Sequence, residues 1–189
     1  MEKPVSLIIS FYNNIALLQM IFAALQRQTL QNFEVIIADD GSTDEVVSKV
    51  AELITSVDFK VTHCWHADNG WQKNIILNKS IVASSGEYLI FIDGDCIPHY
   101  KFIEEHYTNR ILGRVICGRR VQLTPGMTRK LSTTRVKSGY LDTWGWLQIF
   151  IQGIFTGAKH IENGIRITNP WIRKIFIKDK TKGIVGCNF

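Results

Sequence analysis

Two aspartates separated by one glycine follow a short apolar run in the segment "EYLIFIDGDCIP". Asp93 and Asp95 can point at one site, because Gly94 allows unusual dihedral angles in the turn between them. Carboxylates of this kind bind Mg²⁺ or Mn²⁺, and phosphate oxygens and water usually complete the coordination shell. The spacing therefore predicts either a metal site that takes a diphosphate ligand or a plain Asp-Gly turn after a strand.

The aspartates lie within a regular alternation of strand and helix patterns. Apolar, β-branched runs predict strands, and amphipathic runs between them predict helices. The expected strands cover 5–12, 33–42, 59–65, 87–92 and 113–123, and the expected helices end near residues 28, 56, 86 and 111. Asn13 or Asn14 is suited to cap the first helix, and Ser42 with Glu45 has capping-box spacing before the second. This order indicates an α/β fold with a mostly parallel, doubly wound (Rossmann-like) sheet flanked by helices.

Polar side chains follow four of the expected strands at their carboxyl ends. The clusters are Ser10–Asn13, Asp39–Ser42, His66–Gly70 and Asp93–Asp95. Ligands of doubly wound sheets bind beyond the carboxyl ends of the strands. We therefore expect four segments that are distant in the sequence to meet at one rim of the sheet.

Two residues at this rim suit a nucleoside. Asp40 can accept a hydrogen bond from a base or a ribose, and the Tyr12 ring offers a surface on which a base can stack. Each has a structural alternative, since Tyr12 can pack in the core and Asp40 can form a turn that leads into a helix capped by Ser42. His63 and His66 lie at the end of the third expected strand and, without a third ligand nearby, are interpreted as structural.

The same residues carry a resemblance to a known family. The runs "PVSLIISFYNN", "QTLQNFEVIIADDGSTD" and "ASSGEYLIFIDGDCIP" occur in the order and spacing of family 2 glycosyltransferases with the GT-A fold. The resemblance covers residues 4–123. The terminal "GCNF" is similar to the G-C-N-M-S-F segment of a chondroitin-polymerase-like subgroup, whose C-terminal half is galactosyltransferase-like.

This resemblance implies an activity and a set of site residues. The activity is inverting transfer of a sugar from a nucleotide donor, usually a UDP-sugar, to a saccharide or glycoconjugate acceptor, with Mn²⁺ or Mg²⁺ as cofactor. The implied metal ligands are Asp93 and Asp95, and Lys73 stands near the pyrophosphate. Trp71 either walls the donor pocket or begins a helix in the core. The implied nucleotide-sugar-binding residues are Ser10, Phe11, Tyr12, Asn13, Asp40, Trp71, Lys73, Asp93, Gly94 and Asp95.

No residue in the sequence stands out as the general base. Members of the family use an Asp or Glu downstream of the G-C-N segment, and the sequence ends at Phe189. After Glu105 the only acidic residues are Asp142, Glu162 and Asp179, none in a matching context. The expectation is a truncated chain, with the base beyond Phe189, that binds donor but transfers sugar poorly. The alternative is a nucleotide-sugar-binding module without turnover.

The chain divides by charge. Residues 1–105 hold 7 Lys or Arg against 14 Asp or Glu, whereas residues 106–189 hold 15 against 3. The basic half predicts an anionic ligand or a membrane surface, or else a solvated basic face. As domains we expect a nucleotide-sugar-binding core at 1–123 and, at 124–189, a helical, basic segment that leads into the acceptor side.

The stretch "YLDTWGWLQIFIQGIFTG" (140–157) has an apolar helical face but too many polar residues for a membrane span. It fits an acceptor-side lid, an interfacial helix on anionic lipid, or a core helix. Exposed apolar surface here would favour a homodimer. Scattered cysteines and the lack of a signal peptide predict a cytoplasmic protein, with peripheral association at the inner membrane face as a further expectation.

Two rival functions use some of the same features. Phosphoryl transferases of the haloacid-dehalogenase type also carry Asp-x-Asp after a buried strand, but after the first strand rather than the fourth. Nucleic-acid binding by the basic half lacks a motif and would face the net negative charge of residues 1–105, so nucleic acid is not an expected partner.

Overall fold

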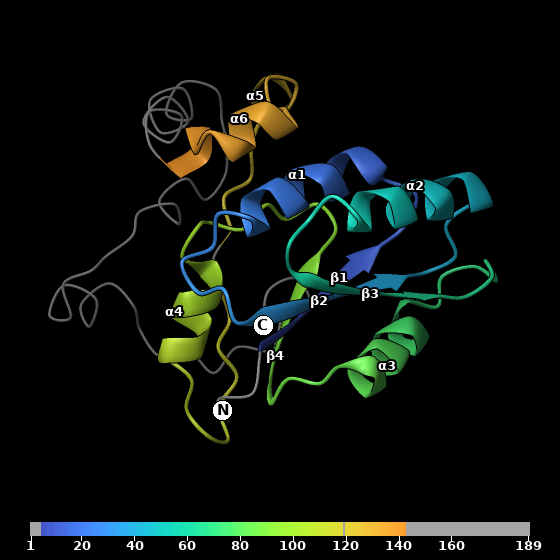
Figure 1. Cartoon of the computed structure of the whole chain (residues 1–189), viewed down its shortest axis with the longest axis horizontal. Helices are drawn as coiled ribbons and strands as arrows, with labels where there is room; N and C mark the ends of the chain where they lie inside the picture. Colours follow the sequence, from blue (N-terminus) through green and yellow to red (C-terminus); the bar gives the residue numbers. More distant parts are fainter. Residues whose placement is uncertain (1–4, 119, 143–189) are drawn as a thin grey trace, which may run out of the picture.

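The computed structural model describes residues 5–118 and 120–142. Four parallel strands form one sheet in the order β3-β2-β1-β4, with helices on both faces (Figure 1). This arrangement confirms the predicted α/β fold. The strands are β1 (Val5–Phe11), β2 (Phe33–Asp39), β3 (Lys60–Trp65) and β4 (Tyr88–Asp93), and the helices are α1 (Ile15–Leu25), α2 (Asp44–Ile54), α3 (Lys73–Ala83), α4 (Phe102–Thr108), α5 (Pro125–Thr128), α6 (Thr133–Lys137) and the 3₁₀ turn η1 (Tyr140–Asp142).

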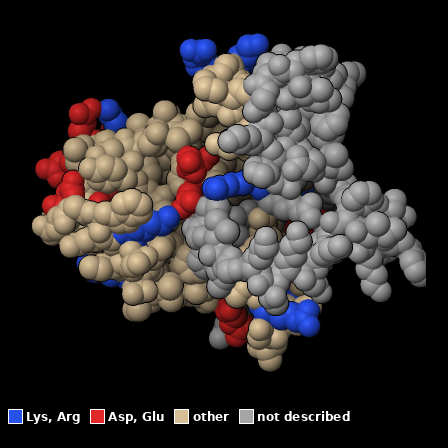
Figure 2. All heavy atoms as spheres, turned by 180° about the vertical axis from the view of Figure 1, so that it is seen from behind, with Lys and Arg blue, Asp and Glu red and all other residues tan. Residues whose placement is uncertain are grey.

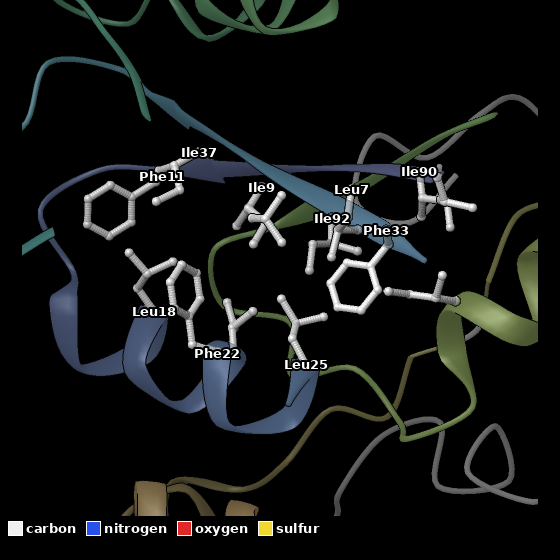
Figure 3. Close-up of a cluster of buried hydrophobic side chains, with 14 of the residues drawn as sticks. Leu7, Ile9, Phe11, Leu18, Phe22, Leu25, Phe33, Ile37, Ile90 and Ile92 are labelled. Carbon is white, nitrogen blue, oxygen red and sulfur yellow. The ribbon is translucent and has the colours of Figure 1, made fainter. Parts of the chain in front are cut away.

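The two faces of the sheet bury different side chains, because successive residues of a strand point to opposite sides. On the face covered by α1 and α2, Leu7 and Ile9 of β1 pack with Phe22 of α1 in the main core (Figure 3). On the face covered by α3, Ile8 packs with Ile76 in a smaller cluster. Burial on both faces explains why the central strands β1 and β2 are almost continuously apolar.

Helix α1 begins where the sequence predicts, because the Asn14 side chain accepts a hydrogen bond from the Leu17 N–H at 3.2 Å. Leu18 and Leu25 point from α1 toward the sheet (Figure 3). On another side of the helix, Ala24 packs with Val136 of α6. Helix α1 is therefore buried between the sheet and α6.

The predicted fifth strand at 113–123 is wrong. Within the described residues of that range there is no strand, and the chain is irregular. Gly113 has a left-handed φ of 75°, and the Val115 side chain is 56% exposed, so the alternating pattern buries no face. Arg120, which falls in the range of the expected strand, lies in this irregular stretch.

The predicted capping box before α2 is also wrong. Thr43 is the N-cap of α2 and makes no side-chain cap bond. The Ser42 hydroxyl instead accepts the Asn13 N–H at 2.8 Å, so a contact to the turn after β1 replaces the local cap. Helix α3 likewise begins at Lys73 rather than at Trp71.

Several predictions lie wholly or partly outside the described residues. The helix expected at 140–157 is described only to residue 142, where η1 is a 3₁₀ turn, and the terminal "GCNF" is outside the described range. The domain boundary at residue 123 stays a prediction. Within the described residues, no helix is long and apolar enough to cross a membrane.

Candidate functional site

The carboxyl ends of β1 and β4 flank the point where the strand order reverses. Strands β1, β2 and β3 are added to the sheet outward in one direction, and β4 then pairs with β1 on its other side. Such a switch point leaves a crevice for ligands. Ser10 and Asp93 are register partners there. A pocket of about 230 Å³ opens at this place, and its lining residues are Ser10, Phe11, Tyr12, Asn14, Leu17, Gly94 and Asp95.

Gly94 is required at this place by close packing. A Cβ added to Gly94 would lie 2.5 Å from the Ser10 carbonyl oxygen, which no side chain tolerates without a backbone shift. The sequence suggested that a glycine is needed here for its dihedral freedom. This is wrong, because the φ of Gly94 is not positive. The close approach joins the turn between Asp93 and Asp95 directly to the end of β1.

Lys73 reaches the first aspartate of this turn. Its Nζ lies 2.6 Å from Asp93 Oδ1, and both side chains are 28% exposed. Asp95 is more exposed than Asp93. The site thus presents one ammonium and two carboxylates to the crevice, a set of charges that suits a diphosphate together with a divalent cation.

The carboxylates fit a metal ion whose coordination is completed by a phosphate ligand better than a metal ion held by protein groups alone. Among the described residues, no group of three or more His, Cys, Asp or Glu side chains could hold a metal ion. Asp93 and Asp95 offer oxygen ligands only, and Mg²⁺ is commonly bound through one or two carboxylates, with substrate phosphates and water filling the remaining positions. The residues present therefore fit a cation that binds together with a phosphate ligand.

Asp40 lies on the other side of β1, directly after β2. Its N–H donates to the Phe11 carbonyl at 3.0 Å, which fixes its backbone beside the end of β1. Its carboxylate accepts from the Gln72 N–H at 3.1 Å and lies 2.9 Å from His66 Nε2. The Asp40 side chain is 15% exposed, so the carboxylate is shielded yet reachable from the rim.

Tyr12 is an exposed ring beside Asp40 rather than a core residue. Its side chain is 52% exposed, which rules out the packing alternative. The hydroxyl donates to Asp68 Oδ2 at 3.1 Å, and this hydrogen bond raises the pKa of Tyr12. The phenol therefore stays protonated near neutral pH, and the ring presents a face that a base can stack on.

The remaining predicted site residues fall into different environments. Phe11 is 4% exposed and its side chain belongs to the main core, although it also lines the pocket. The Asn13 side chain accepts the Thr43 N–H at 3.0 Å and so ties the ends of β1 and β2 together. Trp71 is 87% exposed, which excludes the alternative that it packs in the core at the start of a helix.

Sequence reasoning missed the contacts made by the end of β3. His63 Nε2 lies 2.9 Å from Asp39 Oδ2, and Trp65 Nε1–H donates to the Ser42 carbonyl at 2.9 Å. The structural interpretation of His63 fits this geometry. The signal in the sequence was the placement of polar and aromatic residues at the ends of consecutive strands, whose pairing brings Asp39 opposite Trp65.

Known proteins resemble part of this chain. EpsH of Bacillus subtilis (strain 168) is 36% identical over 115 residues, which cover 59% of this chain and 30% of EpsH. The glycosyltransferase GlyG of Streptococcus pneumoniae serotype 4 is 30% identical over 107 residues, which cover 57% of this chain and 35% of GlyG. The chondroitin synthase of Escherichia coli is 28% identical over 102 residues, 15% of its length. The chain thus spans about a third or less of these curated relatives.

Solved structures show the same fold. A mannosyltransferase from Pyrobaculum calidifontis, solved in complex with GDP-Man and Mn²⁺, superposes with a TM-score of 0.51. The match covers 72% of this chain and 39% of that chain at 20% identity, so it establishes the GT-A fold alone. Sequence comparison at the level of whole families goes further. Residues 6–176 match the family described as "Glycosyl transferase family 2", and this chain therefore belongs to glycosyl transferase family 2.

Proposed function

We propose that this chain is the donor-binding part of a glycosyltransferase that transfers a sugar from a nucleotide-sugar to a saccharide or glycoconjugate acceptor. The observation that carries the proposal is the grouping at the switch point. Lys73 and Asp93 form an ion pair of 2.6 Å on one side of the end of β1, and Asp40 lies on the other side. The Lys73–Asp93 pair suits a diphosphate, and the Asp40 carboxylate suits a nucleoside, so the two places together suit a nucleoside diphosphate.

The nucleoside half of the proposal uses Tyr12 and Asp40. A base stacks on the exposed face of the Tyr12 ring, and an N–H of the base donates to the Asp40 carboxylate. The two residues are joined through the backbone, because the Asp40 N–H bonds to the carbonyl of Phe11, the neighbour of Tyr12. Ser10 lines the pocket and is the register partner of Asp93, and its proposed contact is the ribose of the nucleoside.

The diphosphate half uses Lys73, Asp93 and Asp95. Lys73 stabilises the negative charge of the departing nucleoside diphosphate, because its ammonium is already held at the crevice. Asp93 and Asp95 would hold Mn²⁺ or Mg²⁺, and a cation bound there would neutralise charge on the phosphate oxygens. Gly94 keeps the two carboxylates against β1.

The finer features of the donor and the reaction follow the same argument. We infer a UDP-sugar donor and inversion at the transferred carbon, as the resemblance of the motifs implies. The match to E. coli chondroitin synthase supports the chondroitin-polymerase-like branch. The P. calidifontis mannosyltransferase is bound to GDP-Man and Mn²⁺, which supports a divalent cation while leaving GDP-sugars as the competing donor class. No described residue is proposed as the general base.

A membrane surface is the proposed partner of the basic segment. The exposed cations of α5, α6 and their ends are Arg129, Lys130, Arg135 and Lys137. Basic side chains project from the top edge of the molecule in Figure 2, the edge at which α5 and α6 lie in Figure 1. Each cation near an anionic bilayer contributes about 1 kcal/mol of binding. We therefore propose peripheral association at a cytoplasmic membrane face, while a homodimer stays a prediction.

Calorimetric titration of UDP into the full chain tests the proposed donor site. Titrations with Mn²⁺ and with EDTA are compared for the wild type and Asp95→Ala. The wild type is expected to bind UDP with Mn²⁺ present, and EDTA and the substitution are each expected to abolish most of the binding. Asp58→Ala, an exposed aspartate before β3, serves as the control. Absence of binding by the wild type under all conditions contradicts the proposal.

The second candidate is a binding module that holds nucleotide-sugar without turnover. The feature that supports it is that no residue of the given sequence stands out as a general base. Incubation of the chain with UDP-sugars, Mn²⁺ and saccharide acceptors separates the two candidates. Release of UDP that depends on both acceptor and Asp95 identifies a transferase. Tight UDP binding without release contradicts transfer by this chain alone and favours the module.

A further inference from the structure

The loop that follows β3 contacts both residues assigned to the nucleoside. His66 Nε2 lies 2.9 Å from Asp40 Oδ1, and the Tyr12 hydroxyl donates to Asp68 Oδ2 at 3.1 Å. We propose that residues 66–70, here termed the β3 loop, position the nucleoside pocket and set its choice of base. His66 orients the Asp40 carboxylate, and Asp68 holds the Tyr12 ring. This inference rests on the proposed function.

The contact with His66 fixes how Asp40 can bind a ligand. An ionised carboxylate only accepts hydrogen bonds, so His66 carries a proton on Nε2 and donates it to Oδ1. The Gln72 N–H donates to the other oxygen at 3.1 Å, so both oxygens are held in place. A carboxylate has about four acceptor positions, which leaves lone pairs of Asp40 free for a ligand.

Shielding makes this orientation matter. The side chains of His66 and Asp40 are 11% and 15% exposed, so water competes weakly for the carboxylate. In such a place a ligand that leaves a polar group unpaired is strongly disfavoured. The oriented carboxylate therefore discriminates between ligands and does not merely attract them.

The discrimination follows from the ring nitrogens of the bases. Uracil carries an N–H (N3) between its two ring carbonyls, guanine carries an N–H (N1) beside its single ring carbonyl, and either N–H can donate to Asp40. Cytosine and adenine carry a bare nitrogen at the corresponding edge, whose lone pair would face the carboxylate. A site built to accept an N–H rejects a base that lacks it. The β3 loop thus selects donors that contain uracil or guanine.

Asp68 acts on the stacking surface. The Tyr12 ring is half exposed, so packing alone leaves it free to move, and the hydrogen bond to Asp68 restrains it. Asp68 is itself anchored, because its Oδ1 accepts the Gly70 N–H at 3.0 Å. The same bond to Asp68 raises the pKa of Tyr12, which keeps the phenol a donor.

The loop rests on the turn that carries Asp40. Gly41 has a φ of 96°, and a Cβ at this residue would lie 2.6 Å from the Asp68 Cα. Trp65, the last residue of β3, donates its indole N–H to the Ser42 carbonyl. The β3 loop and the turn after β2 therefore form one packed unit, so a shift in the loop reaches Asp40 and Tyr12 together.

Calorimetric titration of the full chain with UDP, GDP, CDP and ADP, each with Mn²⁺, tests the inference. The wild type is expected to bind the better of UDP and GDP at least about tenfold more tightly than CDP or ADP. His66→Leu is expected to reduce this ratio at least about fivefold, because Asp40 loses its orientation. His66→Gln is expected to restore most of the ratio, since its amide N–H can reach the carboxylate.

A double-mutant cycle tests the Asp68 arm. Asp68→Ala is expected to weaken binding of all four nucleotides by a similar factor, because stacking is insensitive to the base. Adding Tyr12→Phe to Asp68→Ala is expected to cost little more, since the two groups act through one hydrogen bond. Asp58→Ala is the matched control. This exposed aspartate precedes the amino end of β3, whereas the β3 loop follows its carboxyl end.

The outcomes separate this inference from the proposed function. If the wild type discriminates between the bases and His66→Leu keeps the full ratio, the inference is wrong and the proposed function stands. If His66→Gln behaves like His66→Leu, or if each loses binding in step with its melting temperature, the role of His66 is only structural and the inference is wrong. If the wild type binds none of the four nucleotides, the proposed function fails and the inference fails with it.

Discussion

Lys73 Nζ lies 2.6 Å from Asp93 Oδ1 and so links the first turn of α3 to the last residue of β4. Lys73→Gln removes the only positive charge of this pair while keeping a polar side chain. We expect affinity for UDP to fall about tenfold and affinity for uridine to stay nearly the same, because only UDP carries the diphosphate. Calorimetric titration with both ligands in the presence of Mn²⁺ measures the difference.

The matched control for Lys73 is Lys79→Gln, at an exposed position of the same helix. This variant is expected to bind UDP as the wild type does. Equal losses for UDP and uridine in Lys73→Gln would contradict a role at the diphosphate and would indicate a local change in α3 instead.

Gly94→Ala tests the close approach between the turn after β4 and the end of β1. The added Cβ would lie 2.5 Å from the Ser10 carbonyl oxygen, so the turn must move. We expect a loss of about 1–3 kcal/mol in the free energy of unfolding, together with weaker UDP binding. Chemical denaturation and titration measure the two effects. Gly126→Ala is the control, since nothing lies within 4 Å of a Cβ there, and a similar loss in both variants would refute the packing argument.

The lowered pKa of Glu34 predicts how the free energy of unfolding depends on pH. Burial alone would raise the pKa of Glu34, but hydrogen bonds from Lys60, Ser85 and Ser6 outweigh it and lower the pKa to about 2. The pKa is lower in the folded chain than its ordinary value of 4.5, so the contribution to stability is complete above that value. It is lost as the pH falls from about 4.5 toward 2.

Glu34→Gln is expected to lower the free energy of unfolding by about 2–3 kcal/mol at neutral pH and to flatten its acid dependence. Urea denaturation at a series of pH values gives the comparison. Glu52→Gln, on the exposed side of α2, should follow the wild-type curve. A Glu34→Gln curve parallel to the wild type between pH 4.5 and pH 2 would rule out this source of acid sensitivity.

Arg27 connects α1 to the end of the described chain. Its guanidinium lies 2.5 Å from Asp142 Oδ2 and donates to the Val136 carbonyl at 3.3 Å. The Asp142 side chain is only 6% exposed, so removal of Arg27 leaves a buried charge with weaker compensation. We expect Arg27→Met to loosen α6 and η1 from α1 by about 2 kcal/mol while the sheet stays intact.

Hydrogen–deuterium exchange measures this loosening segment by segment. Faster exchange is expected in residues 132–142, with unchanged exchange in β1 and β2. Arg129→Met, at an exposed position after α5, should leave exchange as in the wild type. Unchanged protection of 132–142 in Arg27→Met would mean that the apolar contacts of Val136 alone hold this segment.

Local patterns in the sequence were enough to predict the four described strands and the helices between them. Asn14 does cap α1, and the apolar residues of β1 and β2 are buried on both faces. The strand expected at 113–123 failed because its alternation of apolar and polar residues finds no sheet edge or core to pack on. Pattern alone does not say whether a partner surface exists.

The rim of the sheet was predictable as a place but not as a set of contacts. The rule for parallel sheets brings Ser10, Asp40 and Asp93 to one edge. The bonds of His66 to Asp40 and of His63 to Asp39 depend on the register of β3 against β2, which the sequence does not specify. Ser42 shows the same limit, because a contact with Asn13 replaced the local cap.

The pairing of β1 with β4 has a consequence for how the protein folds. Val5 pairs with Phe33 in β2 and with Tyr88 in β4, so the second pairing closes a far longer loop of chain than the first. Closure entropy grows with loop length, and contacts between distant segments form slowly. The crevice between Ser10 and Asp93 therefore exists only once the most distant pairing has formed. Ligand binding at this crevice accordingly reports completed folding, and a partly folded chain with β1 to β3 in place would have no affinity for the donor.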